Sequence, residues 1–310
     1  MLADASATPA PEAVVLLSEA YLRTGQPRAA EEWLRPRLEG VDRGGDRSAG
    51  RRALNLYGVA AFELGHLEDA EGAFSRALEL ARTDGDDLLI ARAMNNLGQI
   101  ANVRGAHESA LTSYQLALPV YQRLGNQRGL AETYHNMAIT YRDLGQLQRA
   151  DECERRTMEY ARELPHPRLV ALAQAGRAEA TLQSGDAALA LAGARRAAEE
   201  FAGLGDPAGE ADAWRIQGLA AASLGRYPEA LEAVRKAITL ADRHMNPVIE
   251  GEARRALAEI ALLSGDGVTA RREVDLAAKL LERAGAKGAA ERVREWSKRL
   301  PGSAAAGQPG

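Results

Sequence analysis

The stretch LNLYGVAAFELGHLEDAEGAFSRALELA, residues 54–81, contains two apolar patterns separated by a glycine. Before and after Gly65, apolar side chains recur at three- and four-residue spacing, which is typical of amphipathic helices. A glycine between two such segments favours a tight turn. The stretch therefore predicts a helix, a turn and a second helix.

This unit recurs every 40 residues without an insertion or deletion. Each unit has alanine five residues after the turn glycine and a small residue seven residues before it, where two helices are expected to approach closely. A fixed period of this length predicts stacked helix pairs. The seven turn glycines are Gly25, Gly65, Gly105, Gly145, Gly185, Gly225 and Gly265. A further alanine follows twelve residues after most of them, but Arg37 and Thr157 interrupt that series, so repeats one and four are expected to pack differently.

Composition supports an all-α chain and excludes several partners. Aromatic residues make up 5% of the chain, and alanine, leucine, arginine and glutamate dominate. The 39 basic and 43 acidic residues are spread along the whole length and give a net charge of −4, which disfavours binding to nucleic acid or an anionic membrane. A single cysteine fits a reducing compartment, and no signal peptide or membrane span is recognisable. We therefore expect a cytoplasmic protein, and the Ala/Arg/Gly-rich style is compatible with a bacterial source.

The chain ends are expected to differ from the array. Residues 1–11 and 301–310 are predicted to be disordered, and residues 12–300 to form one continuous superhelix. The segment AAERVREWSKRL ends at Leu300 and predicts a capping helix over about 286–300.

Gly58, Ala61, Gly65, Ala70, Phe74 and Ala77 form a pattern of small and large residues that resembles the tetratricopeptide repeat (TPR) family. The resemblance covers residues 12 to about 285. It implies a right-handed α-solenoid of seven helix-turn-helix repeats, with the first helix of each pair lining a concave wall. The usual repeat has about 34 residues. The longer unit of this chain is similar to that of kinesin light chains and of bacterial peptide-sensing regulators.

Polar residues gather at the predicted concave positions of repeats two to four. An amide offers both a donor and an acceptor, which matches the backbone of an extended peptide. Asn96 and Asn136 occupy the same phase one repeat apart, and asparagines at this phase in long-repeat relatives are implied to contact ligand backbone. The candidate peptide-binding residues are Asn55, Arg92, Asn95, Asn96, Gln99, Asn102, His135, Asn136 and Arg142.

Two other interpretations of the wall remain open. The same polar residues also suit a face that is simply solvated, in which each amide bonds its own neighbouring turn. Repeats six and seven are more apolar between charges, so a partner could cross both surfaces, or a terminal helix could fold back there.

Catalytic, metal and cofactor sites are not indicated. His135 and Asp143 lie eight residues apart, roughly 12 Å along one helix, so they cannot form a dyad. Glu132 and His135 offer two metal ligands without a third. Cys153 stands between two glutamates, which disfavour a thiolate. The glycines punctuate helices rather than follow strands, so no phosphate-binding loop is predicted. We expect no enzyme, no metal and no cofactor.

The sequence thus predicts a non-enzymatic scaffold that binds a protein or an extended peptide. Lysine is missing before Lys236, which disfavours the two-carboxylate clamp of TPR co-chaperones. The alternative is a signal-responsive regulator whose array binds a small peptide and changes shape. Its DNA-binding form is disfavoured because residues 1–11 leave no room for a helix-turn-helix domain. Nothing in the sequence indicates the oligomeric state.

Overall fold

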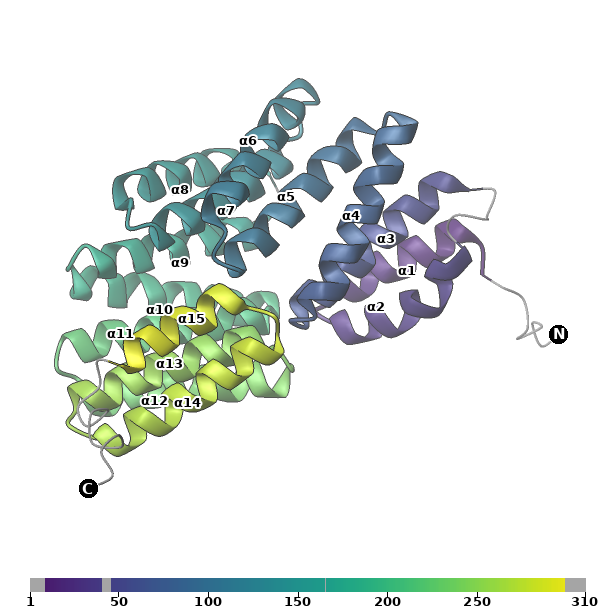
Figure 1. Ribbon diagram of the computed structural model, residues 1–310. Coiled ribbons are helices and arrows are strands. Elements are labelled where there is room, and N and C mark those ends of the chain that lie inside the picture. Colours follow the sequence, from purple (N-terminus) through teal and green to yellow (C-terminus); the bar gives the residue numbers. More distant parts are fainter. Residues whose placement is uncertain (1–8, 41–45, 165, 299–310) are drawn as a thin grey trace.

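The computed structural model describes residues 9–40, 46–164 and 166–298. Within these residues it is all-helical, with seven helix pairs followed by one more helix (Figure 1). The helices are α1 (Pro11–Arg23), α2 (Pro27–Leu34), the 3₁₀ helix η1 (Arg35–Gly40), α3 (Arg47–Glu63), α4 (Leu67–Asp84), α5 (Asp87–Val103), α6 (His107–Arg123), α7 (Gln127–Asp143), α8 (Leu147–Arg162), α9 (Pro167–Gln183), α10 (Ala187–Leu204), α11 (Pro207–Ser223), α12 (Tyr227–Arg243), α13 (Pro247–Leu263), α14 (Gly267–Arg283) and α15 (Lys287–Ser297).

The periodic glycines are the turns between the two helices of each pair. All seven have positive φ angles, between 68° and 96°, a region where a side chain is strained. At the second turn, the Gly65 amide donates to the Phe62 carbonyl (3.0 Å) and the His66 amide to the Ala61 carbonyl (2.8 Å), which ends α3 and redirects the chain. The predicted all-α solenoid is confirmed.

The small residue seven positions before the turn lets the two helices of a pair touch. A Cβ on Gly98 of α5 would lie 2.5 Å from the ring of Tyr114 on α6, and Tyr114 is fully buried. Gly58 and Phe74 repeat this arrangement in the preceding pair. A glycine under an aromatic ring therefore fixes how closely the helices of these repeats pack.

Side-chain caps fix where the first helices begin. In five pairs, the N-cap side chain of the first helix accepts a hydrogen bond from the backbone N–H three residues later. Asp and Asn are preferred at this position because their side-chain oxygens can accept that bond. These caps are Asp46, Asp86, Asn126, Asp206 and Asn246.

The two repeats that lack the second alanine do pack differently. In repeat one, α2 stops at Leu34 and the chain continues as η1, where the Arg37 guanidinium lies 3.5 Å from the centre of the Trp33 ring. In repeat four, the buried Thr157 hydroxyl donates to the Ala131 carbonyl of the preceding helix (3.3 Å).

The last helix closes the array. α15 packs on α14 through buried Ala290 and Val293, while Lys287 and Glu291 on its other side are exposed. The residues predicted to be disordered fall mostly outside the described part of the chain, except that α1 begins at Pro11.

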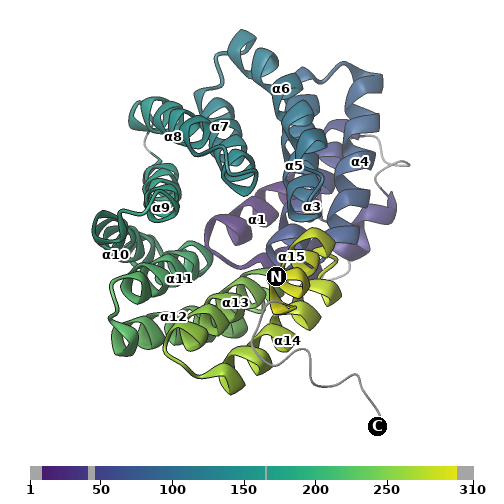
Figure 2. The same cartoon turned by 60° about the vertical axis from the view of Figure 1, so that its left-hand side comes forward.

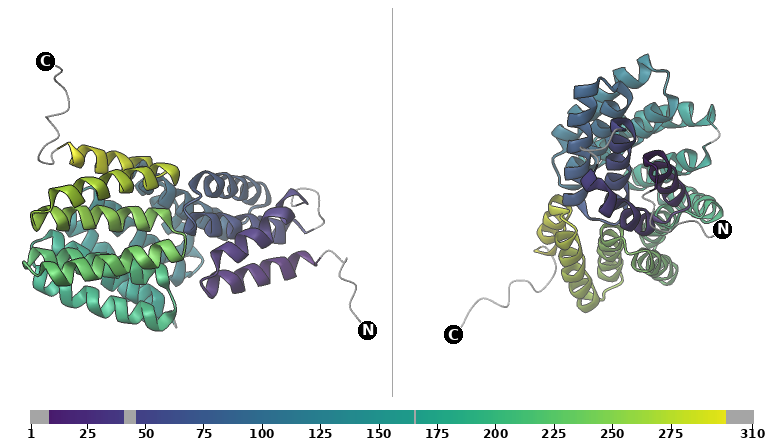
Figure 3. Two further views of the ribbon diagram at one scale, coloured as in Figure 1. Left: turned by 90° about the horizontal axis from the view of Figure 1, so that it is seen from below. Right: turned by 90° about the vertical axis from the view of Figure 1, so that its right-hand side faces the viewer.

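The superhelix curls until its first three repeats contact its C-terminal half, as Figures 2 and 3 show. A Cβ on Gly25 would lie 3.4 Å from the Gly205 carbonyl, one on Gly65 2.8 Å from Pro247, and one on Gly105 3.1 Å from the Gly288 Cα. Each contact joins parts of the chain that are more than half its length apart in sequence. We call this contact line, formed by the turns at residues 25, 65 and 105 against residues 205–207, 246–248 and 285–288, the seam.

Candidate functional site

The first helices of the pairs face the interior of the ring, and the second helices form its outer layer (Figure 2). Every residue of the predicted concave wall lies on a first helix. The first helices that follow α1 form the wall, with α3, α5 and α7 on one side and α9, α11 and α13 on the other.

Hydrogen bonds between neighbouring repeats join the asparagines of this wall. Asn96 Nδ2 donates to Asn55 Oδ1 at 3.2 Å, and Asn136 Nδ2 donates to Asn95 Oδ1 at 3.1 Å. Each bond joins residues 41 positions apart. Two parallel amide pairs thus tie α3 to α5 and α5 to α7, and they explain why a helix carries residues that usually weaken helices. We call these two pairs the amide ladder.

Asn102 belongs to a separate network at the other end of α5. Its Nδ2 donates to Asp143 Oδ2 of α7 at 3.0 Å, and its Oδ1 lies 2.9 Å from His107 Nδ1. Asn102 is buried, so both ends of its amide serve the packing of repeats three and four.

An ionic chain replaces the amides on the second half of the wall. Glu179 of α9 lies between Arg142 of α7 (3.0 Å) and Arg215 of α11 (2.9 Å). Burial alone would raise the pKa of Glu179, but the two guanidinium groups lower it to about 2. On α13, Arg255 pairs with Glu252 at 2.8 Å. Glu179 was not among the candidate residues. The sequence does contain a signal for it, because Arg142, Glu179 and Arg215 alternate in charge over three successive repeats.

The candidate residues differ in their exposure and in how many of their polar atoms are free to bind a ligand. His135 is only 9% exposed and lies 3.1 Å from Glu154 Oε1 of α8, so it serves a contact within its repeat. Asn95 and Asn136 are likewise buried. Arg92 is exposed and makes no hydrogen bond or ion pair within the described chain, and partly exposed Gln99 makes one long contact, of 3.5 Å, to Asn96. Arg92 and Gln99 are therefore the candidates most open to a ligand.

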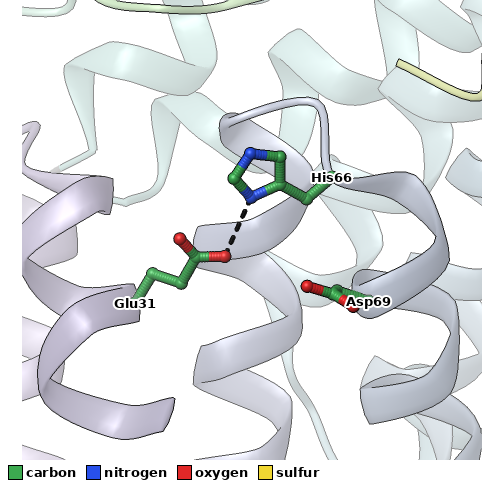
Figure 4. A group of neighbouring side chains, drawn as sticks. All are labelled: Glu31, His66 and Asp69. Carbon is green, nitrogen blue, oxygen red and sulfur yellow. Dashed lines mark hydrogen bonds and ion pairs between the residues drawn. The ribbon is translucent and has the colours of Figure 1, made fainter. Parts of the chain in front are cut away.

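A second group of polar side chains lies between the first two repeats. Glu31, His66 and Asp69 bring their ligand-type atoms within 4.8 Å of one another (Figure 4). The Arg35 guanidinium, however, bonds Glu31 Oε1 at 3.0 Å and Asp69 Oδ2 at 2.9 Å. The position between the carboxylates is thus held by a side-chain cation, and this group is an ion-pair network.

Cys153 is buried in the interface of repeat four. Burial and the neighbouring Glu154 and Glu152 raise the pKa of its thiol to about 12. The thiol is therefore protonated at neutral pH, which disfavours a nucleophile.

No helix in the described residues has the length and apolar character that a membrane span requires. The fold and its inner surface define a helical-repeat solenoid with a polar wall, a class built around its concave face.

The chain belongs to the tetratricopeptide repeat family: models of that repeat match residues 41–87, 89–163 and 176–244, together more than half of its length. No curated protein matches it in sequence. Solved structures that share the fold include the following three. A Rap protein complexed with Competence and Sporulation Factor is 13% identical, with a TM-score of 0.64 over 94% of this chain and 97% of the other. NprR in complex with its cognate peptide NprX is 13% identical, with a TM-score of 0.67 over 93% and 86%. The APC/C hetero-tetramer Cut9–Hcn1 is 15% identical, with a TM-score of 0.62 over 90% and 48%.

Proposed function

We propose that this protein is a non-enzymatic scaffold that binds an extended peptide segment along the inner wall of α3, α5 and α7. The observation that carries the proposal is the set of polar groups on this wall that the fold does not use. Arg92 and the Gln99 carbonyl oxygen have no hydrogen-bond partner in the described residues. They are held on rigid helices that the amide ladder fixes to each other.

The chemistry of these groups suits a peptide backbone. Each asparagine side chain of the amide ladder uses one polar atom for its ladder partner. Asn55 Nδ2 and Asn136 Oδ1 are therefore left for other contacts. Alternating donors and acceptors on one wall match the N–H and C=O groups of an extended chain. Arg92 adds a cation that can bind a carboxylate in bidentate geometry.

The closed superhelix favours a narrow ligand. The seam joins the first three repeats to the C-terminal half of the array, so the wall lies inside a ring (Figure 2). An extended segment needs less room in such a ring than a folded domain does. The Rap and NprR complexes share the fold along most of their length and contain a factor or a peptide, which supports the same kind of ligand for this chain.

The test uses peptides selected from a random phage-displayed library on the wild-type protein. Fluorescence anisotropy then compares the affinity of wild type, Arg92→Ala/Gln99→Ala and the control Arg82→Ala/Gln122→Ala. Arg82 and Gln122 are exposed on the second helices α4 and α6. We expect the wall variant to bind about tenfold more weakly or worse, because it loses a charge-assisted bond and an amide contact. Equal affinity of all three proteins would place the ligand elsewhere.

A second candidate function is a signal-responsive regulator in which the bound peptide changes the shape of the array. The NprR and Rap complexes favour this second function, because they share the fold and contain a peptide or a factor. Small-angle scattering with and without the selected peptide separates the two functions. A passive scaffold keeps its radius of gyration, whereas a regulator changes it.

A further inference from the structure

Two different edges of the superhelix pack against each other in the seam. The turns within repeats one to three form one side, and the connections that follow repeats five to seven form the other. Asn246, the N-cap of α13, holds the two sides together. Its Oδ1 accepts a hydrogen bond from the Ile249 amide at 3.0 Å, and its Nδ2 donates to the Glu63 carbonyl at the end of α3 at 2.8 Å. One side chain therefore caps its own helix and binds the turn across the seam.

Both kinds of edge continue beyond the seam, where no described residue covers them. A Cβ would meet no atom within 4 Å at four turn glycines and two connection glycines, which are Gly145, Gly185, Gly225, Gly265, Gly85 and Gly125. We call the turns of repeats four to seven the free turn edge, and the connections after repeats two and three the free connection edge. The molecule thus presents further lengths of the two surfaces that already fit each other in the seam.

The free turn edge exposes apolar side chains at positions that the seam buries. Leu64 stands one residue before its turn glycine and is 4% exposed in the seam. Leu144 and Leu224 hold the same position in repeats four and six and are 38% and 39% exposed. Leu263 (52%) and Val268 (84%) flank the turn of repeat seven. Exposed apolar side chains gathered on one edge indicate a surface that a partner covers.

The free connection edge carries a side chain equivalent to Asn246. Asn126 is the N-cap of α7, and its Oδ1 accepts a hydrogen bond from the Gly129 amide at 2.8 Å. Asn126 is partly exposed, and its Nδ2 donates to no described residue. This Nδ2 is therefore an unused donor at the position from which Asn246 binds a turn.

We propose that a second copy of this protein docks its free connection edge on the free turn edge, so that the seam contact is repeated between molecules. Asn126 Nδ2 of one molecule donates to the Leu263 carbonyl of the other. Leu263 precedes its turn glycine by two residues, as Glu63 does in the seam. The exposed side chains of Leu263 and Val268 are buried in the same contact.

The charges that meet in this register are complementary. Turns and connections both recur every 40 residues, so the docked molecule places its connection after repeat two at the turn of repeat six. Arg226 lies at that turn, and its side chain is 55% exposed and 3.9 Å from Glu229. The connection opposite it contains Asp84, Asp86 and Asp87. An acidic connection therefore faces a guanidinium.

The proposed interface joins molecules head to tail. Each molecule uses its turn edge for one neighbour and its connection edge for another, so a dimer still has one free edge of each kind. Dimers and longer assemblies are therefore expected as the protein concentration rises. The contact leaves the inner wall uncovered, so this proposal is independent of the one for peptide binding.

Sedimentation equilibrium without added peptide measures the association. Asn126→Asp keeps an oxygen that can cap α7, as Asp206 caps α11, but it places an acceptor against the carbonyl of the second molecule. Leu263→Glu places a charge on the turn edge. Each variant alone is expected to associate at least about tenfold more weakly than wild type. Gln115→Glu adds the same charge at an exposed position in the middle of α6 and should associate like wild type.

A mixture of the two edge variants gives the decisive result. Asn126→Asp retains an intact turn edge and Leu263→Glu an intact connection edge, so an equal mixture should form dimers with wild-type affinity and no larger species. If circular dichroism shows that Asn126→Asp does not fold, Asn126→Ser replaces it, since serine also caps helices. A wild type that stays monomeric up to about 0.1 mM overturns the proposal. Edge variants that associate like wild type, or a mixture that stays monomeric, overturn it as well.

Discussion

Met245 is the only non-glycine residue with a positive φ among those described, at 51°. The corresponding position in the connections between other repeats is Gly85, Gly125, Gly205 or Gly285, each with φ between 62° and 74°. A second glycine series, midway between the turn glycines, therefore marks where each repeat passes to the next. The left-handed conformation costs an L-residue roughly 1–2 kcal/mol, so Met245 stores strain that glycine would not.

Met245→Gly is therefore expected to raise the free energy of unfolding by about 1 kcal/mol. The gain is offset in part by the lost contact of Met245 Sδ with Arg28, at 3.0 Å across the seam. Urea denaturation followed by circular dichroism measures it. Met245→Ala removes the same contact but keeps the strain, so a glycine variant no more stable than the alanine variant would contradict this account.

At the level of elements, repeats two to four are joined by specific polar pairs as well as by apolar packing. The asparagines in α5 bond asparagines in α3 and α7, so they fix the lateral position of each helix against the next. Each hydrogen bond of this kind contributes about 0.5–1.5 kcal/mol.

A double-mutant cycle on Asn95→Ala and Asn136→Ala should give a coupling energy of about 0.5–1.5 kcal/mol in urea denaturation. Asn96 and Asn136 share a phase but bond different partners, so their cycle is expected to give a value near zero. A larger coupling energy for Asn96 with Asn136 than for Asn95 with Asn136 would contradict this pairing. It would show that asparagines at the same position of successive repeats bond each other.

The ionic chain of Arg142, Glu179 and Arg215 is expected to make the stability of the fold sensitive to acid. Because the pKa of Glu179 is about 2 in the folded chain and 4.5 when solvated, its stabilising contribution is present above pH 4.5 and is lost as the pH falls towards 2. Glu179→Gln is expected to cost roughly 2–3 kcal/mol at pH 7, since it leaves Arg142 and Arg215 without their shared partner, and clearly less at pH 3. Urea midpoints at both pH values test this, and an equal loss at each would refute it.

The sequence was sufficient for the helix pairs and their turns because both depend on local patterns that repeat. Gly65 marks a turn, and Asp206 and Asn246 mark helix starts, by rules that act within a few residues. The pairing within the amide ladder was not predictable from phase alone. Neighbouring first helices are staggered, so Asn96 reaches Asn55 rather than the residue at the same phase of the preceding repeat.

The shape of the whole molecule depends on small rotations between successive repeats, which no single repeat encodes. The partners across the seam lie more than half the chain apart in sequence, a separation that the repeat period does not reveal. Closure ties repeat three to the capping helix α15 and links parts of a solenoid that would otherwise contact only their neighbours.

Gly288→Ala should therefore open one end of the seam. A Cβ at this position would lie 2.5 Å from the Arg104 carbonyl carbon and oxygen, so backbone has to move away from backbone. In an ordinary helix the same change stabilises by about 0.5–1 kcal/mol, whereas here we expect a loss of about 1–3 kcal/mol. Hydrogen exchange read by mass spectrometry should rise in the turn after α5, on the opposite side of the seam. Gly267→Ala in α14, where a Cβ meets no atom within 4 Å, supplies the control and should leave that turn protected. Unchanged exchange at the turn in both variants would mean that α15 does not hold repeat three in the seam.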